Sequence, residues 1–204
     1  MVTVRPYGSP VVTGKYPFSG RWSPSGEYYF TNNLQWGFDV RGFFINSVPS
    51  TISVIRFDTQ NTAAPQHRTV ANVESGINSE GIAISPDGSL LATANMQGSF
   101  VTPASDPVFT RNSSVSLLSF DAASGSLRKV AEQPIEGGIL PEGIAFDAVG
   151  RNLVVTTFDY YRSGSNTERI GRGGLDFFRV EGLSLQRSGQ VLVARGAHGV
   201  VVAR

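Results

Sequence analysis

Two glutamates, Glu80 and Glu142, share one short sequence context and are spaced 62 residues apart (80 to 142). Each is followed by Gly-Ile-Ala, and His198 stands in the same way before Gly-Val-Val. Phe18, before Ser-Gly, opens this series and is the one member that cannot ionise. Two carboxylates that meet an imidazole can perform general acid–base chemistry or bind a cation. We therefore take Glu80, Glu142 and His198 as candidate catalytic residues.

Arg195 lies shortly before His198, in the segment ARGAHG. A guanidinium there could hold an oxyanion or an anionic group such as phosphate or carboxylate, which completes the candidate catalytic set. Alternatives remain open for these residues. Glu80 and Glu142 could hydrogen-bond the backbone of neighbouring strands, and His198 could be structural or exposed.

The candidate residues belong to a sequence repeat that occurs three times in the chain. The segment PEGIAFDAVGRNLVVTT (141–157) matches SEGIAISPDGSLLATAN (79–95), and PFSGRWSPSGEYYFTNN (17–33) stands 62 residues earlier. In each copy, short apolar runs flank a turn such as Ser-Pro-Asp-Gly, whose residues suit a β-turn. Repeats of this kind determine the architecture, so they are interpreted before any single motif.

Each unit continues with two more predicted strands, TISVIRFD and HRTVANV in the first copy. Four short antiparallel strands per repeat form the blade of a β-propeller. We predict an all-β single domain over residues 1–204, with blades at approximately 18–79, 80–141 and 142–197. The outermost segments, VTVRPYGSPVV and HGVVVAR, are expected to be partial strands of further blades, which leaves the ring incomplete.

The segments SPDGSLLATAN and PEGIAFDAVGRNLVVTTFD resemble the repeats of YVTN-type and lactonase-type β-propellers. That group includes 6-phosphogluconolactonase-like propellers and many propellers of unassigned role, and the resemblance covers nearly all of the chain. It implies a catalytic set of His, Glu and Arg on the channel face, which here reaches Glu80, Glu142, Arg195 and His198. It also implies a ring of seven blades, from which the three blades of this chain depart.

In a propeller, the loop before the first strand and the loop between the second and third strands lie on one face. The long insertions of this chain therefore mark the binding face. At the ends of the second strands we predict ligand-binding residues for sugar-like hydroxyls or Ca²⁺, with backbone capping as the alternative: Asn33, Asn95, Gln97 and Asp159. Most aromatic residues of the insertions are expected to pack under their loops: Trp36, Phe38, Phe43, Phe44, Phe109, Tyr160 and Tyr161.

Composition limits the function classes. The net charge is +1 and charged residues make up 16%, so nucleic acid and membrane surfaces are not expected partners. Cysteine is absent, which excludes disulfides, thiolate metal sites and a thiol nucleophile. Cofactor motifs are also absent, so we expect no cofactor, with Ca²⁺ as the alternative. The N-terminus lacks the features of a signal peptide, and the compartment stays open between the cytoplasm and the periplasm or exterior.

Three functions follow as hypotheses. The first is a lactonase-like hydrolase that opens a sugar-acid lactone at the channel face. The second is a non-catalytic propeller that binds a small molecule, a glycan or a protein through its long loops. The third is an incomplete propeller that needs partner blades, with two copies closing a homo-oligomeric ring.

Overall fold

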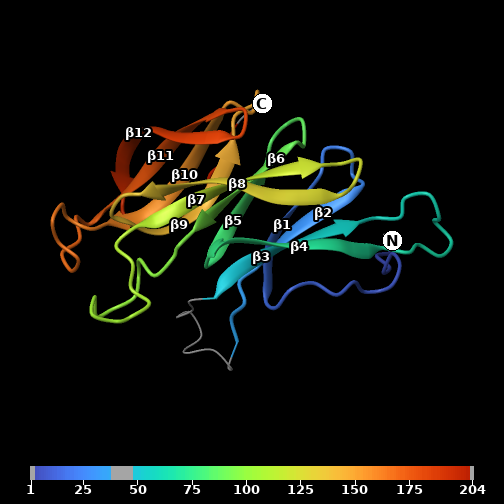
Figure 1. Cartoon of the computed structure of the whole chain (residues 1–204), viewed down its shortest axis with the longest axis horizontal. Coiled ribbons are helices and arrows are strands. Elements are labelled where there is room, and N and C mark those ends of the chain that lie inside the picture. The colour runs from blue at the N-terminus through green and yellow to red at the C-terminus, as the bar shows by residue number, and fades with distance from the viewer. Residues whose placement is uncertain (1–2, 38–47, 203–204) are drawn as a thin grey trace.

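Three antiparallel sheets of four strands each make up the structure, a computed structural model that describes residues 3–37 and 48–202. Within each sheet the strands follow the order of the sequence. The described residues include no helix with the length and apolarity to span a bilayer. The prediction of an all-β fold built from propeller blades in an open ring is confirmed (Figure 1).

The strands fall into three groups along the chain. The first blade contains β1 (Pro17–Trp22), β2 (Tyr28–Asn33), β3 (Pro49–Arg56) and β4 (Arg68–Ile77). The second contains β5 (Ser79–Ile84), β6 (Leu90–Asn95), β7 (Ser113–Asp121) and β8 (Ser126–Ile135). The third contains β9 (Gly138–Phe146), β10 (Asn152–Tyr160), β11 (Arg172–Glu181) and β12 (Ser184–Ala194).

The turn between the first two strands recurs with one geometry. Gly26, Gly88 and Gly150 have φ angles of 73°, 78° and 72°, which a residue without a Cβ adopts freely. In the second blade, the Asp87 carboxylate accepts a hydrogen bond from the Ser85 hydroxyl at 2.6 Å, and this bond helps to lower the Asp87 pKa. The Ser-Pro-Asp-Gly sequence thus supplies local side-chain hydrogen bonds to its own turn.

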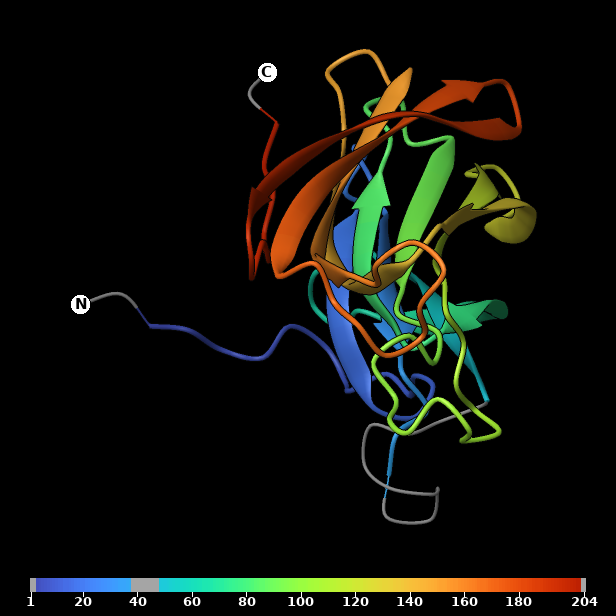
Figure 2. The same ribbon diagram turned by 90° about the vertical axis from the view of Figure 1, so that its left-hand side faces the viewer.

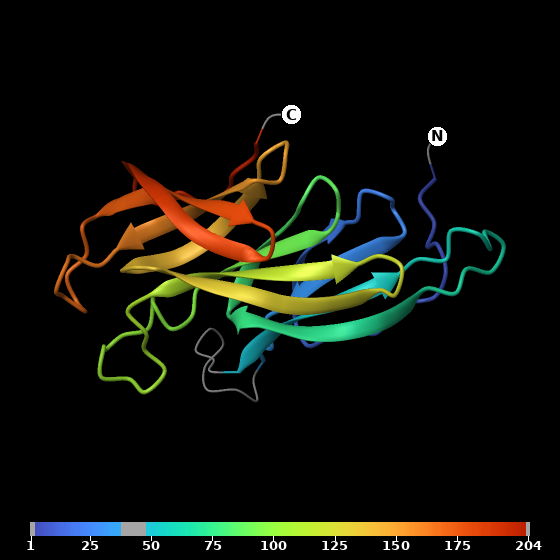
Figure 3. The ribbon, with the colours of Figure 1, turned by 45° about the horizontal axis from the view of Figure 1, so that its top comes forward.

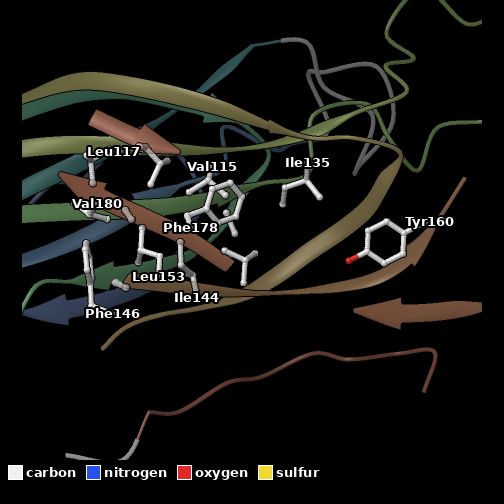
Figure 4. Close-up of a cluster of buried hydrophobic side chains, with 14 residues drawn as sticks. Val115, Leu117, Ile135, Ile144, Phe146, Leu153, Tyr160, Phe178 and Val180 are labelled. Atoms are coloured by element: carbon white, nitrogen blue, oxygen red, sulfur yellow. The ribbon is translucent and has the colours of Figure 1, made fainter. Parts of the chain in front are cut away.

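Apolar side chains alternate along the strands and fill the two spaces between blades. Between the first and second blades lie Phe30, Ile52, Leu118, Phe120 and their neighbours. Between the second and third blades, residues such as Val115 and Leu117 meet large residues of the third blade, among them Phe146 and Phe178 (Figure 4). Each blade therefore depends on its neighbour to remove its apolar face from water.

Along the inner edge of the arc, the first strand of the second blade, β5, contacts both β1 and β9. We call Phe18, Glu80, Glu142 and His198 the strand-opening positions. In the three blades, the residue after this position must be small, because the backbone of the neighbouring strand lies close to it. The Ser19 hydroxyl donates a hydrogen bond to the Glu80 carbonyl at 2.6 Å. A Cβ on Gly81 would overlap the Glu142 carbonyl oxygen, and a Cβ on Gly143 would lie 2.5 Å from the His198 carbonyl oxygen. This close packing places consecutive strand openings side by side.

Two terminal segments lie against the outer blades without joining a sheet. The Thr69 hydroxyl donates to the Val12 carbonyl at 2.5 Å, and the Thr156 hydroxyl donates to the His198 carbonyl at 2.6 Å. These contacts use side chains, and the ladder of backbone hydrogen bonds that defines a strand is lacking in the described parts of both segments. The partial terminal strands expected from the sequence are thus segments outside the sheets in this structure. Within the described residues, both chain ends extend away from the blades toward the same side of the molecule (Figures 2 and 3).

The inner-edge packing yields a stability prediction. Gly81→Ala should lower the free energy of unfolding by about 3 kcal/mol, because the added methyl group overlaps a backbone oxygen that cannot move freely. Gly189→Ala is the matched control, since a Cβ at Gly189 meets nothing within 4 Å. Its effect should stay within about 0.5 kcal/mol. Urea unfolding of both variants measures the difference, and equal effects would contradict the packing described.

Candidate functional site

A pocket of about 220 Å³ opens where the first strands of the three blades meet the C-terminal segment. The strand-opening positions of the repeat all line it, because the small residues behind them let adjacent strands approach closely. The pocket therefore brings together three of the predicted catalytic residues and their non-ionisable counterpart, listed in chain order: Phe18, Glu80, Glu142 and His198.

Glu142 and His198 form the closest contact in the pocket. The His198 Nε2 atom lies 2.5 Å from Glu142 Oε2, and the imidazole is 74% exposed whereas the Glu142 side chain is 14% exposed. Glu142 Oε2 is buried, and its contact with the ring lacks hydrogen-bond geometry. A buried carboxylate oxygen without a hydrogen-bond donor is unusual, because unpaired buried polar atoms are costly.

Glu80 lies in the same pocket on the neighbouring strand. Burial raises the Glu80 pKa to about 7, with the negative charge of Glu142 adding to the rise and His198 opposing it. Burial likewise raises the Glu142 pKa to about 7. Two interacting carboxyl groups titrate as a pair, so the two values describe the pair. Near neutral pH such a pair can hold one proton and one negative charge, which suits it to act as acid and base.

Arg21 also lines the pocket, and the sequence analysis did not single it out. Its guanidinium donates a hydrogen bond to the Gly20 carbonyl at 2.8 Å, which uses one of its five N–H groups. Ala83 and Ala145 occupy the same repeat position in the other blades, each 62 residues further along (21, 83, 145). A position-by-position comparison of the three repeats could have identified this residue, because the first copy carries a charged side chain where the other two carry alanine.

Arg195 does not line this pocket. Its Nε atom donates to the buried Asp159 carboxylate at 2.6 Å, and its guanidinium stacks 5.1 Å from the centre of the Phe158 ring. Asp159 Oδ1 also accepts hydrogen bonds from the Tyr160 and Gly171 amides. In this structure Arg195 and Asp159 thus form an ion pair that anchors the end of β12 to β10.

The remaining predicted ligand-binding residues make hydrogen bonds within their own blades. Asn95 is fully buried; its amide nitrogen donates to Ser114 and Ser116, and its oxygen accepts from two further hydroxyls. Asn33 is fully buried too, with its nitrogen bonded to β3 and its oxygen unpaired among described residues. The partly buried Gln97 donates to Ser114 at 2.8 Å. These amides join the second strand to the third.

Some of the aromatic residues predicted to pack under their loops lie in the described part of the chain, and others lie outside it. Trp36, Tyr160 and Tyr161 are all at least 95% buried, so they pack as expected. Phe109 contacts Tyr161 edge-on, with ring centres 5.9 Å apart. The predictions for Phe38, Phe43 and Phe44 lie outside the described residues. Within the described ranges, no group of three or more His, Cys, Asp or Glu side chains converges in a way that could hold a metal ion.

The raised pKa of Glu80 predicts a pH-dependent stability effect. A carboxyl group whose folded pKa exceeds its unfolded value of 4.5 weakens the fold as pH rises toward 7, because only the unfolded state then releases the proton readily. Glu80→Gln should therefore stabilise the protein by about 1 kcal/mol at pH 8, after allowance for the partly exposed position, and by less at pH 5. Thermal unfolding at the two pH values measures this.

The control for this measurement is Glu132→Gln, which alters a glutamate on an outer strand that pairs with Lys129 at 2.9 Å. Its effect should differ little between pH 5 and pH 8. An effect of Glu80→Gln that is equal at both pH values would contradict the raised pKa.

Comparisons with known proteins agree with the fold. Among solved structures, a functionally unknown protein from Desulfotomaculum acetoxidans superposes with a TM-score of 0.58 at 18% identity, over 91% of this chain and 45% of its own. A protein from Bacteroides fragilis described as a candidate 6-phosphogluconolactonase gives 0.59 at 18% identity, over 88% and 40%. Hydrazine synthase from Kuenenia stuttgartiensis gives 0.59 at 18% identity, over 87% and 43%.

These likenesses concern the fold alone, and the chain spans less than half the length of each of these proteins. No curated protein matches the sequence. The profile of the family described as "Lactonase, 7-bladed beta-propeller" matches residues 40–159, which is more than half of the chain. The repeated blades, the channel-side pocket and this match together lead to one conclusion: the chain belongs to the seven-bladed β-propeller lactonase family.

Proposed function

We propose that the protein hydrolyses the lactone of a sugar acid in the pocket formed by Phe18, Glu80, Glu142 and His198. The observation that carries this proposal is the pair of partly buried carboxyl groups, each with a pKa of about 7, beside an imidazole in a single pocket. Such a pair can take a proton from water and supply one to a leaving oxygen at neutral pH.

The two glutamates divide these roles according to their neighbours. Glu142 lies against His198, and a protonated imidazole favours the ionised form of a carboxylate. Glu142 is therefore the base that removes a proton from the attacking water. The negative charge of Glu142 adds to the rise that burial causes in the Glu80 pKa, and we assign Glu80 as the acid.

The hydrolytic step balances with these groups alone. The water oxygen bonds to the lactone carbonyl carbon while its proton passes to Glu142, and a tetrahedral oxyanion forms. The bond between that carbon and the ring oxygen then breaks as the ring oxygen takes the proton of Glu80, which gives the open-chain hydroxy acid. Arg21 lines the pocket and donates one hydrogen bond, to the Gly20 carbonyl, so its guanidinium can supply positive charge for the oxyanion or an acidic substituent.

The family match supports a lactone as substrate, since the family is described as a lactonase family. The description of the Bacteroides fragilis protein points toward sugar-acid lactones in a propeller of the same fold. A fold hosts many functions, so the proposal stands on the pocket residues.

A second candidate function is binding of a sugar-like ligand without turnover. Two observations favour it: Arg195, predicted to help in catalysis, pairs with Asp159 outside the pocket, and Phe18 offers an exposed aromatic ring inside it. Binding without hydrolysis would show measurable ligand affinity and no turnover in any variant.

Hydrolysis of D-glucono-1,5-lactone, followed by proton release above the spontaneous rate, tests the proposal. Glu142→Gln should lower kcat/KM by about 100-fold or more, because the amide cannot accept the proton of water. The pH dependence of kcat/KM in the unaltered protein should show an apparent pKa near 7 that belongs to the carboxyl pair.

Two control variants accompany this test. Glu132→Gln removes a carboxylate on β8, and His67→Ala removes the histidine whose Nε2 lies 2.8 Å from the Tyr7 carbonyl oxygen. Both lie outside the pocket and should leave the rate unchanged. Activity in Glu142→Gln equal to that of the unaltered protein would contradict the assigned roles.

We further propose that activity depends on closing the ring with more blades, for which a second copy of this chain is one source. Apolar side chains on the outer blades are half exposed, such as Trp22 on the first and Val191 on the third, at 50% and 52%. Self-association would give a solution mass of about twice 21.8 kDa by light scattering. A mass of one chain at all concentrations would contradict closure by self-association.

A further inference from the structure

Phe18 breaks the chemical pattern of the four strand-opening positions. The other three are Glu80, Glu142 and His198, and all four line the pocket. The Phe18 side chain is 51% exposed, although its position in β1 is next to residues that pack tightly against the second blade. The half-exposed ring of Phe18 therefore forms an apolar wall of a pocket that also contains two carboxyl groups.

A buried framework holds the Phe18 ring in place. The Trp36 ring, 1% exposed, lies 6.3 Å from the Phe18 ring, and its Nε1 atom donates a hydrogen bond to Asn78 Oδ1 at 2.7 Å. Asn78 immediately precedes β5, which carries Glu80, and its backbone has a φ of 54°. The same asparagine thus connects the support of the aromatic ring with the strand that positions an acidic group.

The combination of groups specifies the chemistry of a ligand. A six-membered sugar ring has faces of C–H bonds that carry small positive charges, and aromatic faces carry negative charge, so the two stack. The hydroxyl groups at the edge of such a ring can donate hydrogen bonds to carboxylate oxygens, and two glutamates, Glu80 and Glu142, line the same pocket as Phe18. An open-chain polyol has the same hydroxyl groups and no flat apolar face.

We propose that Phe18 is the platform on which the ring of a cyclic sugar ligand stacks, and that it makes the pocket select cyclic over open-chain forms. This inference rests on the proposed function in assigning the same pocket, and it adds the residue that determines specificity. Lactone hydrolysis converts a ring into an open chain. A platform that favours the ring therefore binds substrate in preference to product.

A matched pair of probes tests the platform without requiring turnover. 1,5-Anhydro-D-glucitol is a six-membered ring that cannot be hydrolysed, and D-glucitol is its open-chain counterpart. Titration calorimetry on the unaltered protein should show the ring binding about tenfold more tightly, a difference of about 1.4 kcal/mol. Phe18→Ala should abolish this preference, whereas Phe18→Trp should retain it because the aromatic face remains.

Tyr7→Ala is the control, because Tyr7 is an aromatic residue with a similar exposure of 48% and is absent from the lining of the pocket. It should leave the ring preference unchanged, and far-ultraviolet circular dichroism checks that each variant is folded. Equal affinity for both probes in the unaltered protein, or a preference that survives in Phe18→Ala, overturns the platform.

The outcomes also separate this inference from the proposed hydrolysis. If the protein prefers the ring through Phe18 but hydrolyses no lactone, the platform stands and the catalytic proposal fails. If D-glucono-1,5-lactone is hydrolysed and Phe18→Ala changes neither KM nor the ring preference, the catalytic proposal stands and the platform fails.

Discussion

The close approach of each inner strand to the backbone of the next blade is the constraint on which this structure depends. A serine or glycine directly after the strand-opening residue leaves room for a carbonyl oxygen of the neighbouring strand, as Gly81 does for Glu142. A larger side chain would push the blades apart, and the apolar layers between them would separate with it. The same contact fixes the strand openings side by side, so packing of the fold and assembly of the pocket have one physical origin.

The pocket works against the stability of the blades that form it. Burial raises the pKa of both glutamates to about 7, which means that their ionised forms are disfavoured in the folded state at neutral pH. Two turn carboxylates have the opposite environment: hydrogen bonds from the Ser124 hydroxyl and nearby amides lower the pKa of Asp121, and backbone hydrogen bonds lower that of Asp58. The contrast separates residues that stabilise turns from residues suited to proton transfer.

Much of this arrangement could be predicted from the sequence because the repeat carries it. The 62-residue spacing aligned Phe18, Glu80 and Glu142, and any fold that repeats its strands places equivalent residues at equivalent points. Arg195 and Asp159 could not be placed in this way, since their ion pair forms between β10 and β12 of a single blade, where the repeat gives no guide. Asn95 was ambiguous for another reason: an asparagine after a strand can point outward to a ligand or inward to hydroxyls, and the serines of β7 decide between the two.

The unequal sizes of the side chains between the blades have a consequence for the order of the repeats. The second blade presents Ala92 and Ala94 to the third, which fills the space with Phe146 and Phe178, whereas the first blade presents Tyr28 and Phe30 to the second. The two interfaces are therefore filled by side chains of different sizes, and the faces that meet at them are not equivalent. The three copies of the repeat are thus not interchangeable in this chain, and a permuted order of blades would need new side chains at its interfaces.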